Sequence, residues 1–218
     1  TYPSSPGQLE LGRFLAEELR QMGAMEVEQT ADGIVFATIP ASAGVIAPTI
    51  ALIAHVDTSP ETSGHGVKPV VHAPYDGGDI SYPAVPGLVL SPSKDPELAR
   101  LKGATIITSD GTTLLGADDK AGVAVIMEAA RRLLETPALP RPRIRICFTC
   151  DEEIGHGVDH LAPAVIGAAA CYTLDGCRSS EIDVETFSAD LAVVTISGVN
   201  IHPSIAKGRM TNAVRCAA

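Results

Sequence analysis

The chain has 218 residues and a formal net charge of −10 at pH 7, and 45% of its residues are hydrophobic but only 4% aromatic. This apolar content is enough for a sizeable core, whereas the negative charge argues against nucleic acid and anionic membranes as partners. No apolar stretch reaches the roughly 18 residues of a membrane span, so we expect no membrane partner.

The first half of the chain predicts a helix, two strands and a long irregular segment. Apolar side chains recur at helical spacing over residues 7–22, and Gly23 follows as a helix stop. Residues 34–39 and 49–56 predict strands, the second so continuously apolar that both of its faces should be covered. Residues 58–111 are rich in Pro, Gly and Ser, which predicts loops and short strands.

The middle of the chain alternates between helix and strand patterns. An apolar face at helical spacing predicts a helix over residues 121–135, directly after Asp118 and Asp119. Strands are predicted over residues 143–149 and 168–174. This alternation favours an α/β sheet with covered faces.

The pattern changes near the end of the chain. Residues 181–187 and 192–197 predict successive strands, and a helix is expected to begin near Pro203 or Ser204. We interpret this segment as the start of a second, α+β domain. Two strands and part of a helix form too small a core to stand alone, so we expect the chain to be a fragment. The predicted domains are residues 1–185 and residues 186–218.

Several polar side chains stand directly after predicted strands or before the predicted helix. Ligands in open α/β sheets bind at the carboxyl ends of the strands, so these side chains are expected to cluster there. Clustered carboxylates repel one another unless divalent cations are bound, and imidazole plus carboxylates suits zinc, manganese or cobalt. The pattern therefore indicates a two-metal hydrolase with one glutamate left to act as general base. The side chains are His55, Asp57, Asp118, Asp119, Glu152, Glu153 and Asp175.

The remaining histidines before residue 111 and the C-x-x-C pair are not expected at this site. His65 and His72 have no neighbouring ligand at useful spacing, so we expect surface histidines. Cys147 and Cys150 lie within a predicted strand, where residues three apart point to opposite faces, which argues against a zinc or redox pair. The five cysteines match no disulfide framework, and we expect a reducing, cytoplasmic setting.

Motifs spread along the whole chain resemble the two-zinc metallopeptidase family that contains tripeptide aminopeptidases, aminoacylases and carboxypeptidase G. The YDGGDI and TSDGTTLLGADDKAG segments resemble the tripeptide aminopeptidases in particular. The resemblance implies a mixed-sheet catalytic domain with covering helices, of the zinc-exopeptidase type, followed by the start of a small α+β dimerisation or lid domain. The motifs are residues 55–60 (HVDTSP), 75–80 (YDGGDI), 108–122 (TSDGTTLLGADDKAG), 148–153 (FTCDEE), 172–176 (YTLDG), 202–203 (HP) and 206–208 (AKG).

The resemblance implies two divalent metal ions, with zinc as the expected metal. His55 and Asp175 would bind one ion and Glu153 the other. Asp118 would bridge both ions, and relatives hold its peptide bond to Asp119 in the cis form.

The resemblance also implies catalytic roles. Asp57 would orient the His55 ring, Glu152 would be the general base, and His202 in the small domain would stabilise the oxyanion, in its own or the partner subunit's site. The implied reaction removes the N-terminal residue of tripeptides, so short peptides are the expected substrates. A homodimer would form through the small domain.

Two other interpretations stay open. The same family contains amidohydrolases of acylated amino acids. The chain also stops at Ala218, before the late histidine that is the last metal ligand of relatives, so an inactive, truncated metal-binding remnant is the third hypothesis.

Overall fold

The structure is a computed structural model that describes residues 2–176, 181–185, 188 and 190–217. The chain separates into two compact units, Thr1–Cys177 and Arg178–Ala218. The boundary expected between residues 185 and 186 adjoins residues outside the described part, and it stays a prediction. No helix among the described residues is both long and apolar enough to cross a membrane.

The first unit is built on a five-stranded mixed sheet. The two pairings between strands at one side of the sheet are antiparallel, and the two at the other side are parallel. This arrangement confirms the predicted α/β class with a mixed sheet. In spatial order the strands are β1 (Met25–Gln29), β2 (Val35–Ile39), β8 (Ile144–Thr149), β3 (Ile50–His55) and β9 (Ala170–Thr173).

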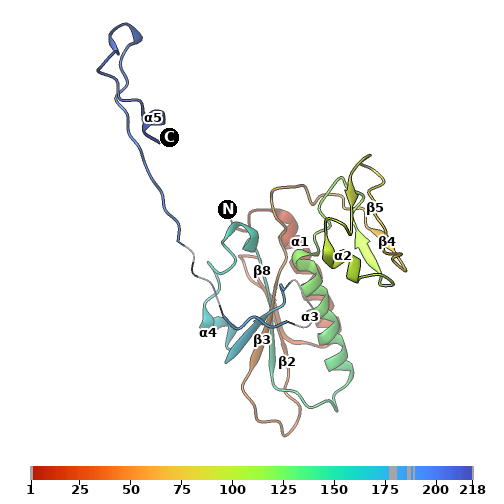
Figure 1. The fold of residues 1–218 in the computed structure, drawn as a ribbon. Helices are drawn as coiled ribbons and strands as arrows, with labels where there is room; N and C mark the ends of the chain where they lie inside the picture. Colours follow the sequence, from red (N-terminus) through yellow and green to blue (C-terminus); the bar gives the residue numbers. More distant parts are fainter. Residues whose placement is uncertain (1, 177–180, 186–187, 189, 218) are drawn as a thin grey trace. The chain divides into compact units, whose positions relative to one another are not determined.

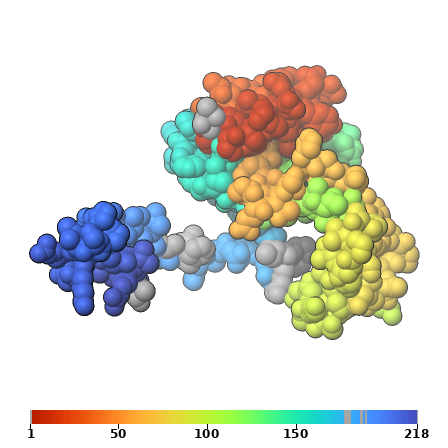
Figure 2. Space-filling model, turned by 90° about the horizontal axis from the view of Figure 1, so that it is seen from above, coloured from red at the N-terminus to blue at the C-terminus, as the bar shows by residue number. Residues whose placement is uncertain are grey.

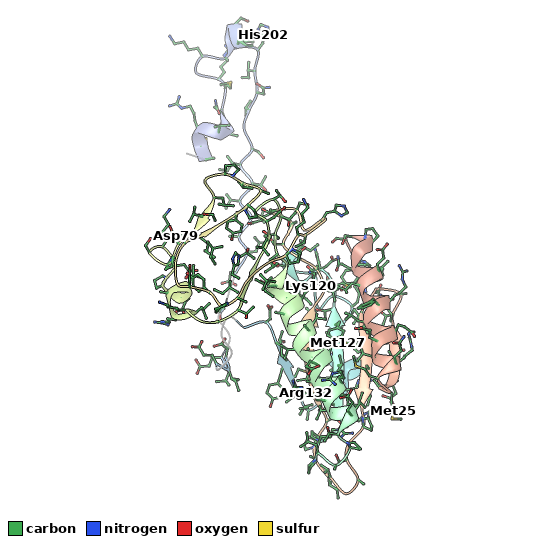
Figure 3. The ribbon with its side chains drawn as sticks, turned by 90° about the vertical axis from the view of Figure 1, so that its right-hand side faces the viewer. Met25, Asp79, Lys120, Met127, Arg132 and His202 are labelled. Carbon is green, nitrogen blue, oxygen red and sulfur yellow. The ribbon has the colours of Figure 1, made fainter. Side chains whose placement is uncertain are left out.

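Two long helices, α1 (Pro6–Gln21) and α3 (Ala117–Glu135), cover the same face of this sheet (Figure 1). Their apolar faces and the inward side chains of β2, β3 and β8 form the main core. Leu19 of α1 and Ile126 of α3 are fully buried there. Figure 3 follows α3 from Lys120 through Met127 to Arg132, and Lys120 marks the end of the helix at which the chain enters it.

The opposite face of the sheet carries a smaller core. Ile34, Phe36 and Cys147 are buried there, with Ile53 and Leu161 packed against them. Leu161 belongs to the segment after β8, which contains the 3₁₀ turn η1 (Glu152–Ile154) and the short helix α4 (Pro163–Ile166).

An insertion between β3 and α3 forms its own small lobe, drawn in yellow to yellow-green in Figure 2. Tyr75, Ile80 and Leu98 are its buried core. The sequence predicted loops and short strands here, and the structure adds one short helix whose first turn is capped by Asp95. The elements are β4 (Val70–His72), β5 (Ile80–Ser81), β6 (Val89–Leu90), α2 (Pro96–Arg100) and β7 (Ile106–Thr108).

The predicted helices and strands of the first unit are present, and their ends agree with the prediction within two residues except at the start of α3. Helix α3 is bounded at Ala117, but Asp118 and Asp119 have non-helical backbone angles, so regular helical geometry begins after them, as the sequence predicted. Strand β1 was not predicted, because its sequence MEVEQ is mostly polar and its side chains are largely exposed. An edge strand of this kind is defined by its pairing to β2, which the local sequence does not reveal.

The second unit differs from the sequence-based expectation. Residues 181–185 and 192–197 form no strand, and the rest of the first predicted strand lies outside the described residues. A strand needs a hydrogen-bonding neighbour, and the described part of this unit offers only the isolated bridge between Val199 and Thr211. The predicted helix is limited to the 3₁₀ turn η2 (Pro203–Ile205) and, later, α5 (Ala213–Ala217).

Gly208 explains why the turn at Pro203 does not extend into a helix. Its φ of 71° is left-handed, a conformation that ends helices.

Candidate metal centre

The parallel pairing of β3 with β8 and β9 brings three chain segments to one edge of the sheet. His55, the last residue of β3, is the register partner of Thr149 in β8, and Ile53 is the partner of Thr173 in β9. The polar residues that follow each strand therefore emerge side by side, as the sequence predicted.

The imidazole of His55 lies at the centre of this edge and is 2% exposed. Its Nε2 is 3.0 Å from Asp118 Oδ1, 3.8 Å from Asp175 Oδ2 and 3.9 Å from Glu152 Oε2. The structure thus brings β3, the start of α3 and the segments after β8 and β9 to a single nitrogen atom.

Asp57 connects the ring of His55 to the segment after β8. Its Oδ1 lies 3.2 Å from His55 Nδ1. The same oxygen accepts the backbone N–H of Glu152 at 3.1 Å, and Oδ2 accepts that of Glu153 at 3.0 Å. Burial alone would raise the pKa of Asp57, but these hydrogen bonds, the one from His55 first, lower it.

Two groups of side chains offer ligand atoms within 4.8 Å of one another: His55 with Asp118 and Glu153, and His55 with Asp119 and Asp175. One imidazole nitrogen with carboxylate oxygens is a donor set that zinc accepts. The orienting contact from Asp57 to the far ring nitrogen is the outer-sphere partner that metal-binding histidines usually have. The described residues therefore fit a divalent metal ion.

The electrostatics of the cluster favour bound positive charge. Burial alone would lower the pKa of His55, but the hydrogen bond and charge of Asp57 and the charge of Asp175 raise it to about 9. Burial, with the charges of Asp119 and Asp118, raises the pKa of Asp175 to about 6. Both shifts favour the protonated form of the group, because negative charge surrounds it.

The sequence did not predict the structural role of Asp119. Its side chain is buried, and its two oxygens accept the N–H groups of His55 at 3.1 Å and Gly122 at 3.2 Å. It thereby fastens the end of β3 to the first turn of α3. The peptide bond between Asp118 and Asp119 is cis, as the resemblance implied.

Lys120 supports the same junction. Its Nζ donates to the carbonyl of Val56 at 3.4 Å, and burial lowers the pKa of its ammonium group. The DDK sequence contains Asp119 and Lys120, but the backbone groups of β3 and of Val56 that they bind lie more than 60 residues away along the chain.

Three other histidines named from the sequence are not among the two groups of ligand atoms. His202 belongs to the second unit, where its Nδ1 accepts the backbone N–H of Ser204. His65 is exposed, and His72 contacts Thr108, so neither is part of the two groups of ligand atoms.

The C-x-x-C pair is not part of the site. Cys147 and Cys150 are buried free thiols, and burial raises the pKa of each to about 12, which disfavours the thiolate that zinc or redox chemistry needs.

Comparisons with known proteins show what this chain is similar to. Residues 109–213 match the sequence pattern of "Peptidase family M20/M25/M40". The chain is 47% identical over 217 residues to peptidase T of Geobacillus thermodenitrificans and 48% identical over 212 residues to peptidase T of Clostridium perfringens. These alignments take in 100% and 97% of the chain but 53% and 52% of those proteins, so the chain spans about half the length of the curated relatives it matches.

Solved structures give the same relationship. An aminopeptidase PepT from Bacillus cereus superimposes with a TM-score of 0.60 and 28% identity, over 95% of this chain and 49% of that one. A tripeptidase from Staphylococcus aureus gives a TM-score of 0.54 and 25% identity, over 76% of this chain and 37% of that one. The resemblance to the tripeptide aminopeptidase group and the predicted fold are both confirmed.

Gly122 provides a test of the junction between α3 and the site. A Cβ atom there would lie 2.1 Å from the Leu174 carbonyl oxygen and 2.4 Å from Asp119 Oδ1, so Gly122→Ala must displace one of them. We expect a loss of about 1–3 kcal/mol in unfolding free energy, the usual effect of overpacking, together with weaker Zn²⁺ binding. Urea unfolding and calorimetric Zn²⁺ titration would measure the two effects.

Gly7→Ala is the matched control, because the same substitution in α1 meets no atom within 4 Å. We expect Gly7→Ala to leave stability equal or higher and Zn²⁺ binding unchanged. Equal behaviour of the two variants would contradict the packing argument.

Proposed function

Because this chain is a relative of peptidase T, we propose that its protein is a two-metal aminopeptidase that removes the N-terminal residue of tripeptides. The observation that carries the proposal is the convergence of Asp118, Glu152 and Asp175 on the buried Nε2 of His55. The present chain supplies these residues from separate segments, and it is 47% identical over 217 residues to about half of a peptidase T.

The proposed metals are two zinc ions. His55, Asp118 and Asp175 would hold one ion, Asp118 and Glu153 the other. Bound ions of this kind polarise a scissile carbonyl and let water lose a proton near neutral pH. Asp119 is not assigned as a ligand, because both of its oxygens already accept backbone N–H groups.

The proposed general base is Glu152. Its side chain is 52% exposed, so it can reach solvent and substrate, while Oε2 stays 3.9 Å from His55 Nε2. Asp57 fixes its backbone N–H and so limits where the carboxylate can move. Glu152 would take a proton from the attacking water and pass it to the departing amine.

Asp57 and His202 complete the proposed machinery. Asp57 would keep His55 in the tautomer and orientation that present Nε2 to a metal. His202 would donate to the oxyanion of the tetrahedral intermediate. We further propose that His202 acts within a homodimer formed through the small domain, and that the enzyme works in the cytoplasm, where free thiols such as Cys147 and Cys150 persist.

A substrate panel tests the reaction. The full-length gene product with Zn²⁺ should hydrolyse a free tripeptide and leave its N-acetylated form intact, because an aminopeptidase needs the free amino group. Released N-terminal amino acid would be measured by chromatography. Preference for the acetylated peptide would move the protein to the acylated amino acid amidohydrolases, and no hydrolysis of either would favour an inactive metal-binding protein.

The two adjacent glutamates should give different phenotypes. Glu152→Ala should retain both zinc ions and lower kcat by about 10²–10⁴-fold, the usual contribution of a general base. Glu153→Ala should instead weaken the binding of one ion. Zinc content after dialysis and turnover of a free tripeptide would be measured in parallel.

Glu28→Ala is the matched control, because Glu28 is an exposed carboxylate on edge strand β1, at the other side of the sheet from β9. It should change neither zinc content nor turnover. Exchanged phenotypes for Glu152→Ala and Glu153→Ala would reverse the two assignments.

A further inference from the structure

A buried carboxylate, Asp151, stands between the end of β8 and the two glutamates, and the proposed reaction gives it no part. Asp151 is only 2% exposed to solvent. Its φ of 58° lies in the left-handed region, which few residues other than glycine adopt. The surrounding structure must therefore hold Asp151 in place.

The N-terminal segment does so with four hydrogen bonds. Asp151 Oδ2 accepts the backbone N–H of Ser4 at 2.7 Å, and Oδ1 accepts the Ser4 hydroxyl and Gln8 Nε2, each at 2.6 Å. In return, Gln8 Oε1 accepts the backbone N–H of Asp151 at 3.0 Å. Gln8 is 4% exposed, so both of its amide atoms are committed within the protein interior.

These donors are neutral, which separates Asp151 from the metal-facing carboxylates. A buried carboxylate is unfavourable unless its oxygens accept hydrogen bonds, and here each oxygen does so. The carboxylate is therefore satisfied without a cation.

The same N-terminal segment holds the neighbouring residues as well. Tyr2 donates its hydroxyl to the carbonyl of Cys150 at 3.1 Å, and its ring lies 4.3 Å from the ring of His160. Residues before α1 thus contact the chain on both sides of the glutamates, although the two segments lie almost 150 positions apart in the sequence.

On its other side the segment with the glutamates is held by Asp57, which accepts the N–H groups of Glu152 and Glu153. The segment is fixed between two carboxylates: Asp57, which follows β3, and Asp151, which the N-terminal segment secures. We propose that Asp151 and Gln8 form a positioning pair that sets where Glu152 and Glu153 stand, and so controls affinity for the ion that Glu153 holds. This inference rests on the proposed two-metal function.

A reciprocal exchange of the two side chains tests the pair. Gln8→Glu places two carboxylates against each other. In Asp151→Asn one acceptor oxygen becomes an NH₂ group, which must face either the NH₂ of Gln8 or the backbone N–H of Ser4. In the double variant the new amide can donate to the new carboxylate, which can still accept the backbone N–H of residue 151. Loss in both single variants and recovery in the double variant would therefore report this contact.

The measurements are Zn²⁺ titration of the metal-stripped, full-length gene product and steady-state kinetics on a free tripeptide. Outer-sphere substitutions usually cost 10–100-fold in metal affinity or activity. We expect each single variant to weaken one of two Zn²⁺ affinities by about that factor, leave the other within about threefold, and lower kcat more than it changes KM. The double variant should regain most of both losses.

Gln21→Glu is the matched control, since it makes the same chemical change on the same helix at an exposed position that contacts Glu17. It should leave both Zn²⁺ affinities and kcat unchanged. Ser4→Ala, which removes only the hydroxyl donor to Asp151, should give a smaller loss of the same Zn²⁺ affinity and of kcat. If a single variant at Gln8 or Asp151 does not fold, Ser4→Ala tests the positioning role instead.

The outcomes separate the two proposals. A parent protein that binds no Zn²⁺ and cleaves no peptide would overturn the proposed function. A parent that does both, with single variants whose melting temperature falls while both affinities and kcat stay the same, would overturn only the positioning role. Loss in the single variants without recovery in the double variant would show that the contact between Gln8 and Asp151 is not the cause.

Discussion

Negative charge gathered around one buried imidazole is the constraint on which the rest of this structure depends. Carboxylates from the ends of three strands and the start of one helix reach the same edge of the sheet, and Asp118 and Asp175 lie within 4 Å of His55 Nε2. The hydrogen bond and charge of Asp57, with the charge of Asp175, raise the pKa of His55, while burial and the charges of Asp119 and Asp118 raise that of Asp175. Divalent cations are the natural counter-charge for such a group.

The fold divides the carboxylates into two classes. Asp57, Asp119 and Asp151 accept backbone or side-chain N–H groups and act as braces that join β3, α3, the segment after β8 and the N-terminal segment. Asp118 and Glu153 are left facing the imidazole. This division explains how a cluster of acids can stand in a stable sheet: hydrogen-bond donors stabilise the buried carboxylates, and the accessible ones are left for cations and substrate.

The sheet and the metal-facing residues could be predicted from the sequence because both follow from local rules. Continuous apolar runs predicted β3 and β8, and the strand-end rule then placed His55 and Glu153 together. The contact from Asp57 to His55 was expected, but the bracing roles of Asp119 and Asp151 were not, because a hydrogen bond such as that from Gln8 to Asp151 joins residues 143 positions apart and has no local pattern. The strand predicted at residues 192–197 was wrong for a related reason, since apolar alternation marks a strand only where a partner strand is present.

The most direct test of the central claim is to locate bound metal by anomalous diffraction at the zinc absorption edge, in crystals of the full-length gene product grown with Zn²⁺. We predict two peaks about 3.5–4 Å apart, with Asp118 touching both. One peak should lie against His55 and Asp175 and the other against Glu153, at ligand distances of about 2.0–2.2 Å. Zinc bound elsewhere, or no zinc between His55 and Asp118, would contradict the assignment of this strand-end cluster as the metal centre.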